Sequence, residues 1–281
     1  HQGVALPREV EDQPQFSSLS ESELPPDTPV LTWKHHGGLR VYPLALLQEN
    51  PVVHDTVLGQ KVAVTWSSPS STGTVLGLPP ESSGFQPTGD LLFRNRIFID
   101  RKSGSPWNIL NGTALYGASQ GAKVQSLSAV HLLPRSAILD ENAAVWVSEK
   151  PYLTPPHLPA QKDLVLLLQG HGETPAWRLA TIHNQGLIHQ ELGGEPIILA
   201  SVGHSAVAWG RSIGTESLSF SRCATNALCD TKTGSRFSLA SGQAVSGPLK
   251  GQTLPAIVSL QTPMNAWVSV FPGERLDGHR E

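Results

Sequence analysis

The sequence predicts a mainly β fold made of two tandem homologous units, barrel-like or sandwich-like, related by internal duplication. Glycine and proline are abundant, with 26 and 23 copies among 281 residues, while charged residues make up only 15%. This composition is typical of short strands joined by turns. A pattern that begins at Asp100 also returns at Asp230 without a gap, and such self-similarity indicates duplication.

The two copies of the pattern agree at eight positions, and Phe237 takes the place of Trp107. The identical pairs are Asp100/Asp230, Lys102/Lys232, Gly104/Gly234, Ser105/Ser235, Gly112/Gly242, Ala114/Ala244, Gly117/Gly247 and Gly121/Gly251. Gly117 to Gly121 also spell G-x-S-x-G, the nucleophile elbow of α/β-hydrolases. The second copy keeps both glycines but has Leu249 at the serine position, so the glycines are predicted to be structural. No catalytic residue is predicted.

Residues 1–28 are polar, rich in Pro, Ser and acidic residues, and carry no sustained periodicity. Such a segment would be disordered alone, so it is predicted to be an extended arm held by the chain's own surface or by a neighbouring subunit. The apolar residues expected to dock it include Val4, Leu6 and Phe16.

A second irregular stretch is rich in proline and is predicted to be a stiff, extended linker. The predicted order along the chain is an arm at 1–28, unit one at 29–150, the linker at 151–162, unit two at 163–276 and a tail at 277–281.

Within the units, short runs of apolar and β-branched residues predict strands. In unit one these are 39–42, 61–66, 74–76, 91–99 and 145–147, and in unit two 177–179, 196–202, 206–211, 218–222 and 267–270. A short helix is expected at 43–48, where proline fits the first turn. Trp146 is paired with Trp267 as the corresponding residue of the other unit.

The net charge of -3 and the absence of a Lys/Arg cluster argue against a nucleic-acid partner. No apolar run approaches the length of a membrane-spanning helix. The start at His1, without an initiator Met, fits a mature exported protein, so an extracytoplasmic location is expected, whether periplasmic, cell-surface or secreted. Cys223 and Cys229 are the only cysteines, and they are predicted to form a disulfide, the alternative being two inert thiols.

Three blocks carry a resemblance to a known family. They are R-V-Y-P at Arg40, the His54–Asp55 pair followed by T-W-S-S-P-S-S-T-G-T, and the D-R-K-S-G-S-P-W block at Asp100. Together they resemble the bacterial and archaeal family DUF3179, a domain of unknown function, over about residues 30 to 145. Unit two resembles a more eroded copy, and its tail from Trp267 is similar to the closing W-x-x-F-x-P of the family. The resemblance implies an exported or membrane-anchored, β-rich protein.

Departures from the family pattern bear on activity. Members carry a His-Glu pair where this chain has Asn50-Pro51, and cysteines where it has the serine-rich stretch from Ser67 to Ser71. If those His, Glu and Cys side chains hold a metal or perform redox chemistry, this chain has lost them. These losses favour a scaffold over an enzyme.

The candidate binding residues are Arg40, Tyr42, His54, Asp55, Asp100, Ser105 and Trp107. Each also has a structural interpretation. Adjacent residues on a strand point to opposite faces, so His54 is interpreted as a histidine at a strand edge and Asp55 as the cap of a turn. Asp100 and Ser105 can bond to the backbone of a turn, and Trp107 can pack in the core.

The leading hypothesis is an exported structural, binding or assembly protein, a component of a larger extracytoplasmic assembly, with no cofactor. Its partner would be another protein or a second copy, engaged through the arm. The alternative is a copper or other metal-dependent redox protein that uses the amine and imidazole of His1 with further histidines drawn from His35, His36, His131, His171, His183, His204 and His279. A third possibility is a carbohydrate-binding surface on Trp33, Trp177 or Trp209.

Overall fold

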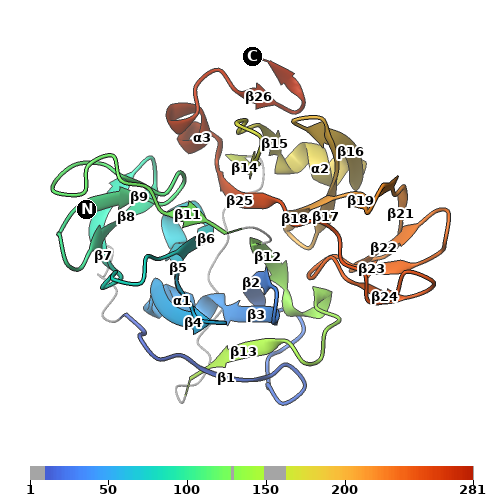
Figure 1. Ribbon diagram of the computed structural model, residues 1–281, viewed down its shortest axis with the longest axis horizontal. Helices are drawn as coiled ribbons and strands as arrows, with labels where there is room; N and C mark the ends of the chain where they lie inside the picture. The colour runs from blue at the N-terminus through green and yellow to red at the C-terminus, as the bar shows by residue number, and fades with distance from the viewer. Residues whose placement is uncertain (1–9, 128–129, 149–162, 281) are drawn as a thin grey trace.

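The computed structural model describes residues 10–127, 130–148 and 163–280 (Figure 1). It is mainly β, with 52% strand and 11% helix, which confirms the predicted fold class. The strands form several separate sheets, and those of the described residues close no barrel. The predicted linker at 151–162 lies outside the described residues.

The first part of the chain forms three sheets, coloured blue to green in Figure 1. Its elements are β1 (Gln15–Ser18), β2 (Pro29–His35), β3 (Gly38–Pro43), α1 (Leu44–Glu49), β4 (Val52–Val57), β5 (Gln60–Ser67), η1 (Ser68–Ser70), β6 (Thr72–Gly77), β7 (Phe85–Leu92), β8 (Asn95–Asp100), β9 (Pro106–Asn108), β10 (Thr113–Ala114), β11 (Gln125–Ser126), β12 (Val130–Pro134), η2 (Arg135–Ala137) and β13 (Ala144–Val147). The sheet orders are β1-β13-β3-β2-β12, β11-β6-β5-β4 and β10-β9-β8-β7.

The second part, yellow to red in Figure 1, follows a similar course. Its elements are β14 (Leu164–Gln169), β15 (Ala176–Arg178), α2 (Leu179–Gln185), β16 (Leu187–Leu192), β17 (Glu195–Val202), β18 (Ser205–Gly210), β19 (Ser212–Ile213), β20 (Glu216–Ser217), β21 (Phe220–Ala224), β22 (Ala227–Asp230), β23 (Arg236–Ser238), β24 (Ala244–Ser246), β25 (Val258–Pro263), α3 (Met264–Val270), β26 (Arg275–Leu276) and β27 (His279–Arg280). The main sheets are β25-β14-β15-β26-β27, β16-β17-β18 and β21-β22-β23-β24.

The two five-stranded sheets share one arrangement. In each, three antiparallel strands, β12-β2-β3 or β25-β14-β15, are extended by a parallel strand, β13 beside β3 and β26 beside β15. The outermost strand then comes from opposite ends of the described chain, since β1 belongs to the N-terminal segment and β27 to the C-terminal one. This common order is what the predicted duplication requires, and the duplication itself stays an interpretation of the sequence.

The two parts share a hydrophobic core. One buried cluster combines Val30, Val41 and Leu133 from the first part with Trp209 and Phe237 from the second. At the same boundary the buried ring of His131 stacks edge-on against Trp209, with centroids 5.0 Å apart. Because apolar side chains from both parts exclude water together in this cluster, the parts stabilise each other, and each part also has buried clusters of its own.

Most predicted strands are confirmed, with two corrections. The single strand expected at 91–99 is a hairpin, in which Phe93 and Arg94 turn with φ of 49° and 70° between β7 and β8. The strand expected at 267–270 is the helix α3, which buries Trp267 and lets its Nε1 donate to Thr174 O at 2.9 Å. The pairing of Trp146 with Trp267 is therefore wrong, because Trp146 lies on β13.

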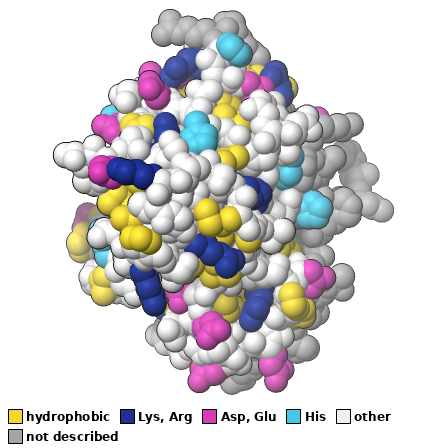
Figure 2. Space-filling model, turned by 90° about the vertical axis from the view of Figure 1, so that its right-hand side faces the viewer, with side chains coloured by type: hydrophobic (Ala, Val, Ile, Leu, Met, Phe, Trp, Pro, Cys, Tyr) yellow, Lys and Arg dark blue, Asp and Glu magenta, His cyan; other side chains and the backbone are white. Residues whose placement is uncertain are grey.

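Two other expectations are confirmed. Helix α1 covers the predicted helix, although Pro43 is its N-cap rather than its first residue. Cys223 and Cys229 are disulfide-bonded across the β21–β22 hairpin, with Cα atoms 5.7 Å apart. Lys and Arg side chains are scattered among acidic and apolar ones over the face shown in Figure 2, and they form no continuous basic patch there.

Candidate functional site

The N-terminal segment from Val10 to Ser18 docks on the chain's own surface. Strand β1 pairs antiparallel with β13, so Phe16 lies opposite Trp146. The ring of Phe16 meets Tyr42 edge-on at 5.9 Å, and the guanidinium carbon of Arg40 lies 4.0 Å from the same ring. The predicted docking through Phe16 is thus confirmed, on the chain's own surface, whereas Val4 and Leu6 lie outside the described residues.

Ahead of β1, the same segment adds to the outer edge of β4. Glu11 N donates to Val52 O at 3.1 Å, and Glu11 O accepts from His54 N at 2.8 Å, forming a parallel bridge. The segment leaves the edge at Gln13, whose own N–H bonds to the Glu11 side chain. The next outward N–H of β4, that of Thr56, donates to the Asp55 carboxylate at 2.7 Å.

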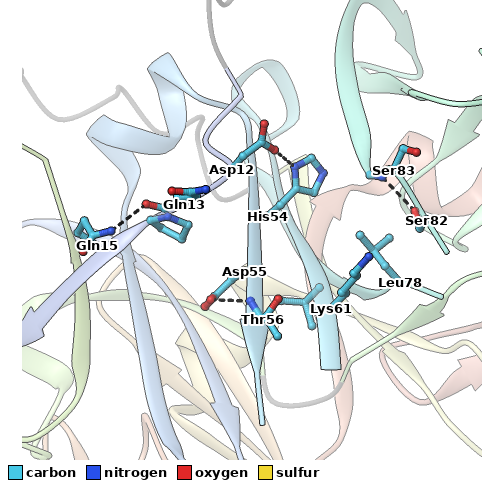
Figure 3. A pocket seen from close by; sticks show the side chains of 13 residues that line it. Asp12, Gln13, Gln15, His54, Asp55, Thr56, Lys61, Leu78, Ser82 and Ser83 are labelled. Carbon is cyan, nitrogen blue, oxygen red and sulfur yellow. Dashed lines mark hydrogen bonds and ion pairs between the residues drawn. The ribbon is translucent and has the colours of Figure 1, made fainter. Parts of the chain in front are cut away.

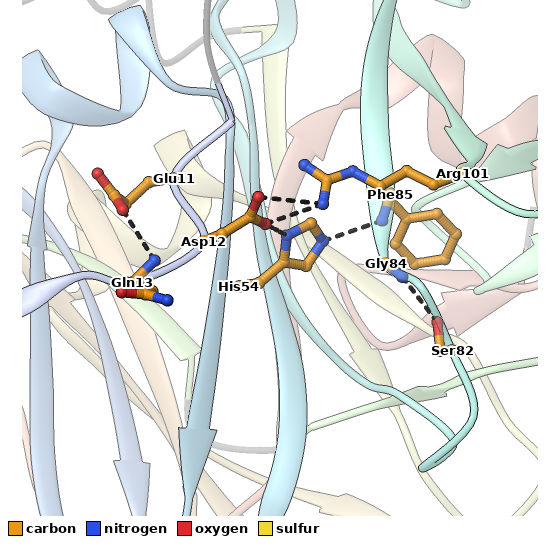
Figure 4. Close-up of polar contacts among 8 residues, drawn as sticks. All are labelled: Glu11, Asp12, Gln13, His54, Ser82, Gly84, Phe85 and Arg101. Atoms are coloured by element: carbon orange, nitrogen blue, oxygen red, sulfur yellow. Dashed lines mark hydrogen bonds and ion pairs between the residues drawn. The ribbon is translucent and has the colours of Figure 1, made fainter.

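A clamp of two side chains holds Asp12 (Figure 4). Nη1 of Arg101 lies 2.9 Å and 3.2 Å from the two carboxylate oxygens of Asp12, and Nδ1 of His54 lies 2.7 Å from one of them. Burial acts to raise the pKa of Asp12, but the hydrogen bonds from Arg101 and His54 outweigh it and the pKa is lowered. The clamp therefore recognises a carboxylate.

His54 is fully committed to this arrangement. Its Nε2 accepts the backbone N–H of Phe85 at 2.9 Å, so the ring proton sits on Nδ1 and is donated to Asp12. Burial lowers the pKa of His54, against the opposing effect of Asp12, and this favours the neutral ring. Neither nitrogen is available as a general base or a metal ligand while the arm is docked.

Gly84 permits this contact, because a Cβ there would lie 2.3 Å from His54 Nε2. His189 repeats the contact in the second part of the chain, where Phe220 N donates to its Nε2 at 3.3 Å. In both parts the histidine and the phenylalanine are separated by the same 31 residues. The shared role of the histidine is therefore to join two strands.

Asp55 points to the opposite face of β4 from His54. Its Oδ2 lies 3.2 Å from Arg40 Nε and accepts from the Tyr42 hydroxyl at 3.4 Å. Burial, followed by the nearby Asp55, raises the pKa of Tyr42, which keeps the phenol protonated. The predicted residues Arg40, Tyr42 and Asp55 thus form one cluster beneath Phe16, and His54 and Asp55 form no acid/base pair.

Asp100, Ser105 and Trp107 do not join that cluster. Asp100 Oδ1 accepts from Lys102 N and Ser103 N, at 2.9 Å and 2.6 Å, within a turn. Trp107 packs in the core against Phe85, with ring centroids 5.5 Å apart. These contacts support the structural interpretation of the three residues.

Ser105 shows why the glycines recur in both copies. Its Oγ accepts from Ser119 N at 3.0 Å, just as Ser235 Oγ accepts from Leu249 N at 3.0 Å. The G-x-S-x-G stretch is therefore a turn folded over Ser105, and it leads into the strand β11 rather than into the helix that a nucleophile elbow needs.

A polar groove of about 390 Å³ opens between the docked segment and β4–β5 (Figure 3). Its lining includes Gln13, Gln15, Thr56, Lys61 and Ser83. Lys61 Nζ donates to Pro80 O at 2.5 Å, which fixes the lysine at one side of the groove. Amide, ammonium and carboxylate groups share this lining about equally with apolar surface, which includes Val62 and Leu78, so it suits an extended peptide segment that carries both kinds of group.

Sequence reasoning missed Asp12 and Arg101. One signal marks Arg101: the corresponding residue of the second copy is Thr231, although the turn residues on either side are shared. A cation that only one copy keeps is not required by the turn. Asp12 carries no comparable signal, because nothing in an irregular segment indicates where it will dock.

The serine-rich stretch from Ser67 to Ser71 forms a buried hydrogen-bond network. Ser70 Oγ donates to Asn95 Oδ1 at 2.8 Å, and Ser67 Oγ accepts from Arg96 N at 2.9 Å. These bonds brace the β7–β8 hairpin against η1. Among the residues that the structure describes, no three His, Cys, Asp or Glu side chains gather as metal ligands would.

Two remaining predictions can now be placed. His1, on which the copper alternative depends, lies outside the described residues. Trp33, Trp177 and Trp209 are buried, with 4%, 2% and 1% exposure, so the predicted carbohydrate-binding surface of exposed tryptophans is wrong. None of the described helices is long and apolar enough to cross a membrane.

Comparison with known proteins gives one match. A family model described as "Protein of unknown function (DUF3179)" covers residues 7–274, nearly the whole chain. No curated protein and no solved structure matches the chain.

Proposed function

The chain belongs to the DUF3179 family, whose function is unknown, and we propose that it is an exported binding or assembly protein that receives an extended acidic segment along β4. The segment would come from another component of an extracytoplasmic assembly. The disulfide supports export, because such bonds persist in oxidising compartments.

One observation carries the proposal: the chain's own residues 11 and 12 already bind in this way. Glu11 supplies the main-chain bonds of an added strand, and Asp12 supplies the carboxylate that Arg101 and His54 hold. Strand addition gives affinity through the backbone and specificity through side-chain pockets. The docked segment is thus a ligand held in cis, and a partner segment of the same chemistry would compete with it.

The polar groove extends the same surface beyond Gln13. Where the chain's own segment turns away towards β13, a partner segment could continue along β4 past Thr56 and Lys61. The Thr56 N–H, now bonded to the neighbouring Asp55 carboxylate, would become a further main-chain donor. A partner segment would therefore make more backbone bonds than the segment held in cis.

The proposal is tested with a fluorescent peptide of residues 10–18, V-E-D-Q-P-Q-F-S-S. The receptor is the full chain carrying Asp12→Asn and Phe16→Ala, which loosen its own segment without removing it. We expect this receptor to bind the peptide, and a peptide with Asp12→Asn to bind about tenfold more weakly, because a charge-assisted bond is lost.

Arg101→Gln in the same receptor should weaken binding of the unmodified peptide to a similar extent, while Lys102→Gln, one residue along, should leave it unchanged. The proposal would be contradicted if the receptor did not bind the peptide, or if Arg101→Gln left the affinity unchanged. Stoichiometric metal in untagged protein would instead favour the copper alternative based on His1.

A further inference from the structure

Strand β16 repeats the local geometry of β4. Both begin hairpins with two-residue turns, Leu58–Gly59 and Gly193–Gly194, whose φ values are 50° and 82°, and 58° and 84°. In such hairpins the residues flanking the turn form a hydrogen-bonded pair. Alternation then directs the backbone groups of residues 187, 189 and 191 away from β17, as those of 52, 54 and 56 are directed away from β5.

The outward edge of β16 has no backbone partner among residues 10–127, 130–148 and 163–280. This is the difference between the two strands, because Glu11 covers the corresponding edge of β4. An edge of this kind presents unpaired N–H and C=O groups to which another strand can add.

His189 lies on the edge of β16 as His54 lies on the edge of β4. Its Nε2 accepts from Phe220 N at 3.3 Å, which leaves Nδ1 as the ring nitrogen that corresponds to the donor holding Asp12. His189 is exposed, whereas the side chain of His54 is only 14% exposed beneath Asp12. The histidine therefore offers a donor to an incoming acceptor.

A cationic side chain again lies near the histidine. It is Arg211, which follows β18, whereas Arg101 follows β8. The guanidinium of Arg211 is held on the carbonyls of Ile197 and Leu218, while His189 pairs with the neighbouring Ile198 and accepts from Phe220 N. Burial, and to a smaller extent Arg211, lowers the pKa of His189. Nε and Nη1 of Arg211 donate to Ile197 O and Leu218 O, and Nη2 has no hydrogen-bond partner within the described part of the chain. The acidic residue on the same edge is Glu191, which opposes an anionic guest two positions beyond His189.

We infer that the outer edge of β16 is a second site for an extended acidic segment of a partner protein, added as a strand with its carboxylate between His189 and Arg211. This inference rests on the proposed function of β4 and makes the chain a bivalent receptor. Two linked sites would raise avidity for a partner that carries two such segments.

The wild-type full chain provides the test, because residues 11 and 12 occupy its β4 edge and compete with the peptide there, and Glu191 variants report on the β16 edge alone. We expect it to bind the peptide of residues 10–18, and Glu191→Pro to weaken binding about tenfold or more by removing one outward N–H. Glu191→Gln is the matched control. It keeps the N–H and removes the repelling charge, so it should bind at least as tightly as wild type.

If circular dichroism shows that Glu191→Pro alters folding, amide hydrogen exchange of the wild-type chain provides the second measurement. Saturating peptide should slow exchange at His189 and Glu191 of the wild-type chain. Binding that leaves both amides unprotected, or that survives Glu191→Pro in a folded variant, would overturn the inference.

The failures of the two proposals are distinguishable. If the wild-type chain binds no peptide but the Asp12→Asn, Phe16→Ala receptor does, the β16 site is refuted and the β4 site stands. If neither binds, both proposals fall. Self-association of the wild-type chain that Glu191→Pro abolishes would assign the edge to a second copy and overturn its assignment to a partner.

Discussion

Nδ1 of His54 lies 2.7 Å from Oδ1 of Asp12, joining the N-terminal segment to a strand 42 residues further along the chain. The same ring accepts a backbone N–H through Nε2, so it acts as a bridge between three segments. A histidine bonded to an aspartate is also the arrangement that acid/base catalysis uses. Here both ring nitrogens are bonded, and the contact holds an acidic segment on a sheet edge.

Arg101→Gln should loosen the docked segment by about 1 kcal/mol, because Asp12 is half exposed and water screens the pair. The amide of His54, which donates to Glu11 O, should then exchange about fivefold faster at neutral pH. Lys102→Gln is the control and should leave that rate unchanged. Equal rates in wild type and Arg101→Gln would show that the clamp contributes nothing to docking.

His131 should make folding stability depend on pH. Burial lowers its pKa to about 4, against the opposing effect of the nearby backbone of Ala208 and Ala240. Because this pKa lies below the unfolded value of 6.5, the stabilisation is present above pH 6.5 and is lost as the pH falls towards 4. The loss amounts to about 3 kcal/mol.

The check is urea unfolding of wild type and His131→Phe between pH 7.5 and 4.5. Phe keeps the ring that stacks on Trp209 and cannot titrate, so its stability should fall less with acid. Some acid sensitivity should remain, because burial also lowers the pKa of His35 to about 4. Parallel curves for the two proteins would be incompatible with this role of His131.

Gly117→Ala and Gly247→Ala should each destabilise the fold by about 1–3 kcal/mol. Their φ values are 86° and 88°, and an added Cβ would lie 2.9 Å from Ser105 Oγ and 2.8 Å from Ser235 Oγ. Gly121→Ala is the matched control, since its φ is 78° but nothing lies within 4 Å of its Cβ. Thermal unfolding should show a smaller loss for Gly121→Ala than for the other two.

Replacing Cys223 and Cys229 together by serine should cost about 2 kcal/mol, the value expected for a short closed loop. Wild type should lose the same amount in reductant, and the double serine variant should be unaffected by reductant. A reductant effect of equal size on both proteins would place the sensitivity elsewhere.

The sequence predicts the strands well where apolar residues alternate and glycine or proline marks the ends, as in β5 and β17. It fails at α3, where the run Trp267–Val270 resembles a strand but follows Pro263, and a proline N-cap with a buried Trp267 favours a helix turn. It also fails at the turn of Phe93 and Arg94, because non-glycine residues there adopt positive φ without a compositional signal.

The site is only half predictable for a related reason. Arg40, Tyr42, His54 and Asp55 lie on regular strands whose alternation fixes their faces. Asp12 belongs to a segment that becomes ordered only through tertiary contacts, and Arg101 acquires its role only when that segment arrives. Local patterns carry no information about such distant pairings.

The most direct test of the account follows the His54 amide by hydrogen exchange in the full chain carrying Asp12→Asn and Phe16→Ala. We expect exchange about tenfold faster than in wild type, and protection restored when the peptide of residues 10–18 is added at saturation. An amide that stays protected in the variant, or that stays unprotected with peptide bound, would contradict the claim that the edge of β4 receives extended acidic segments.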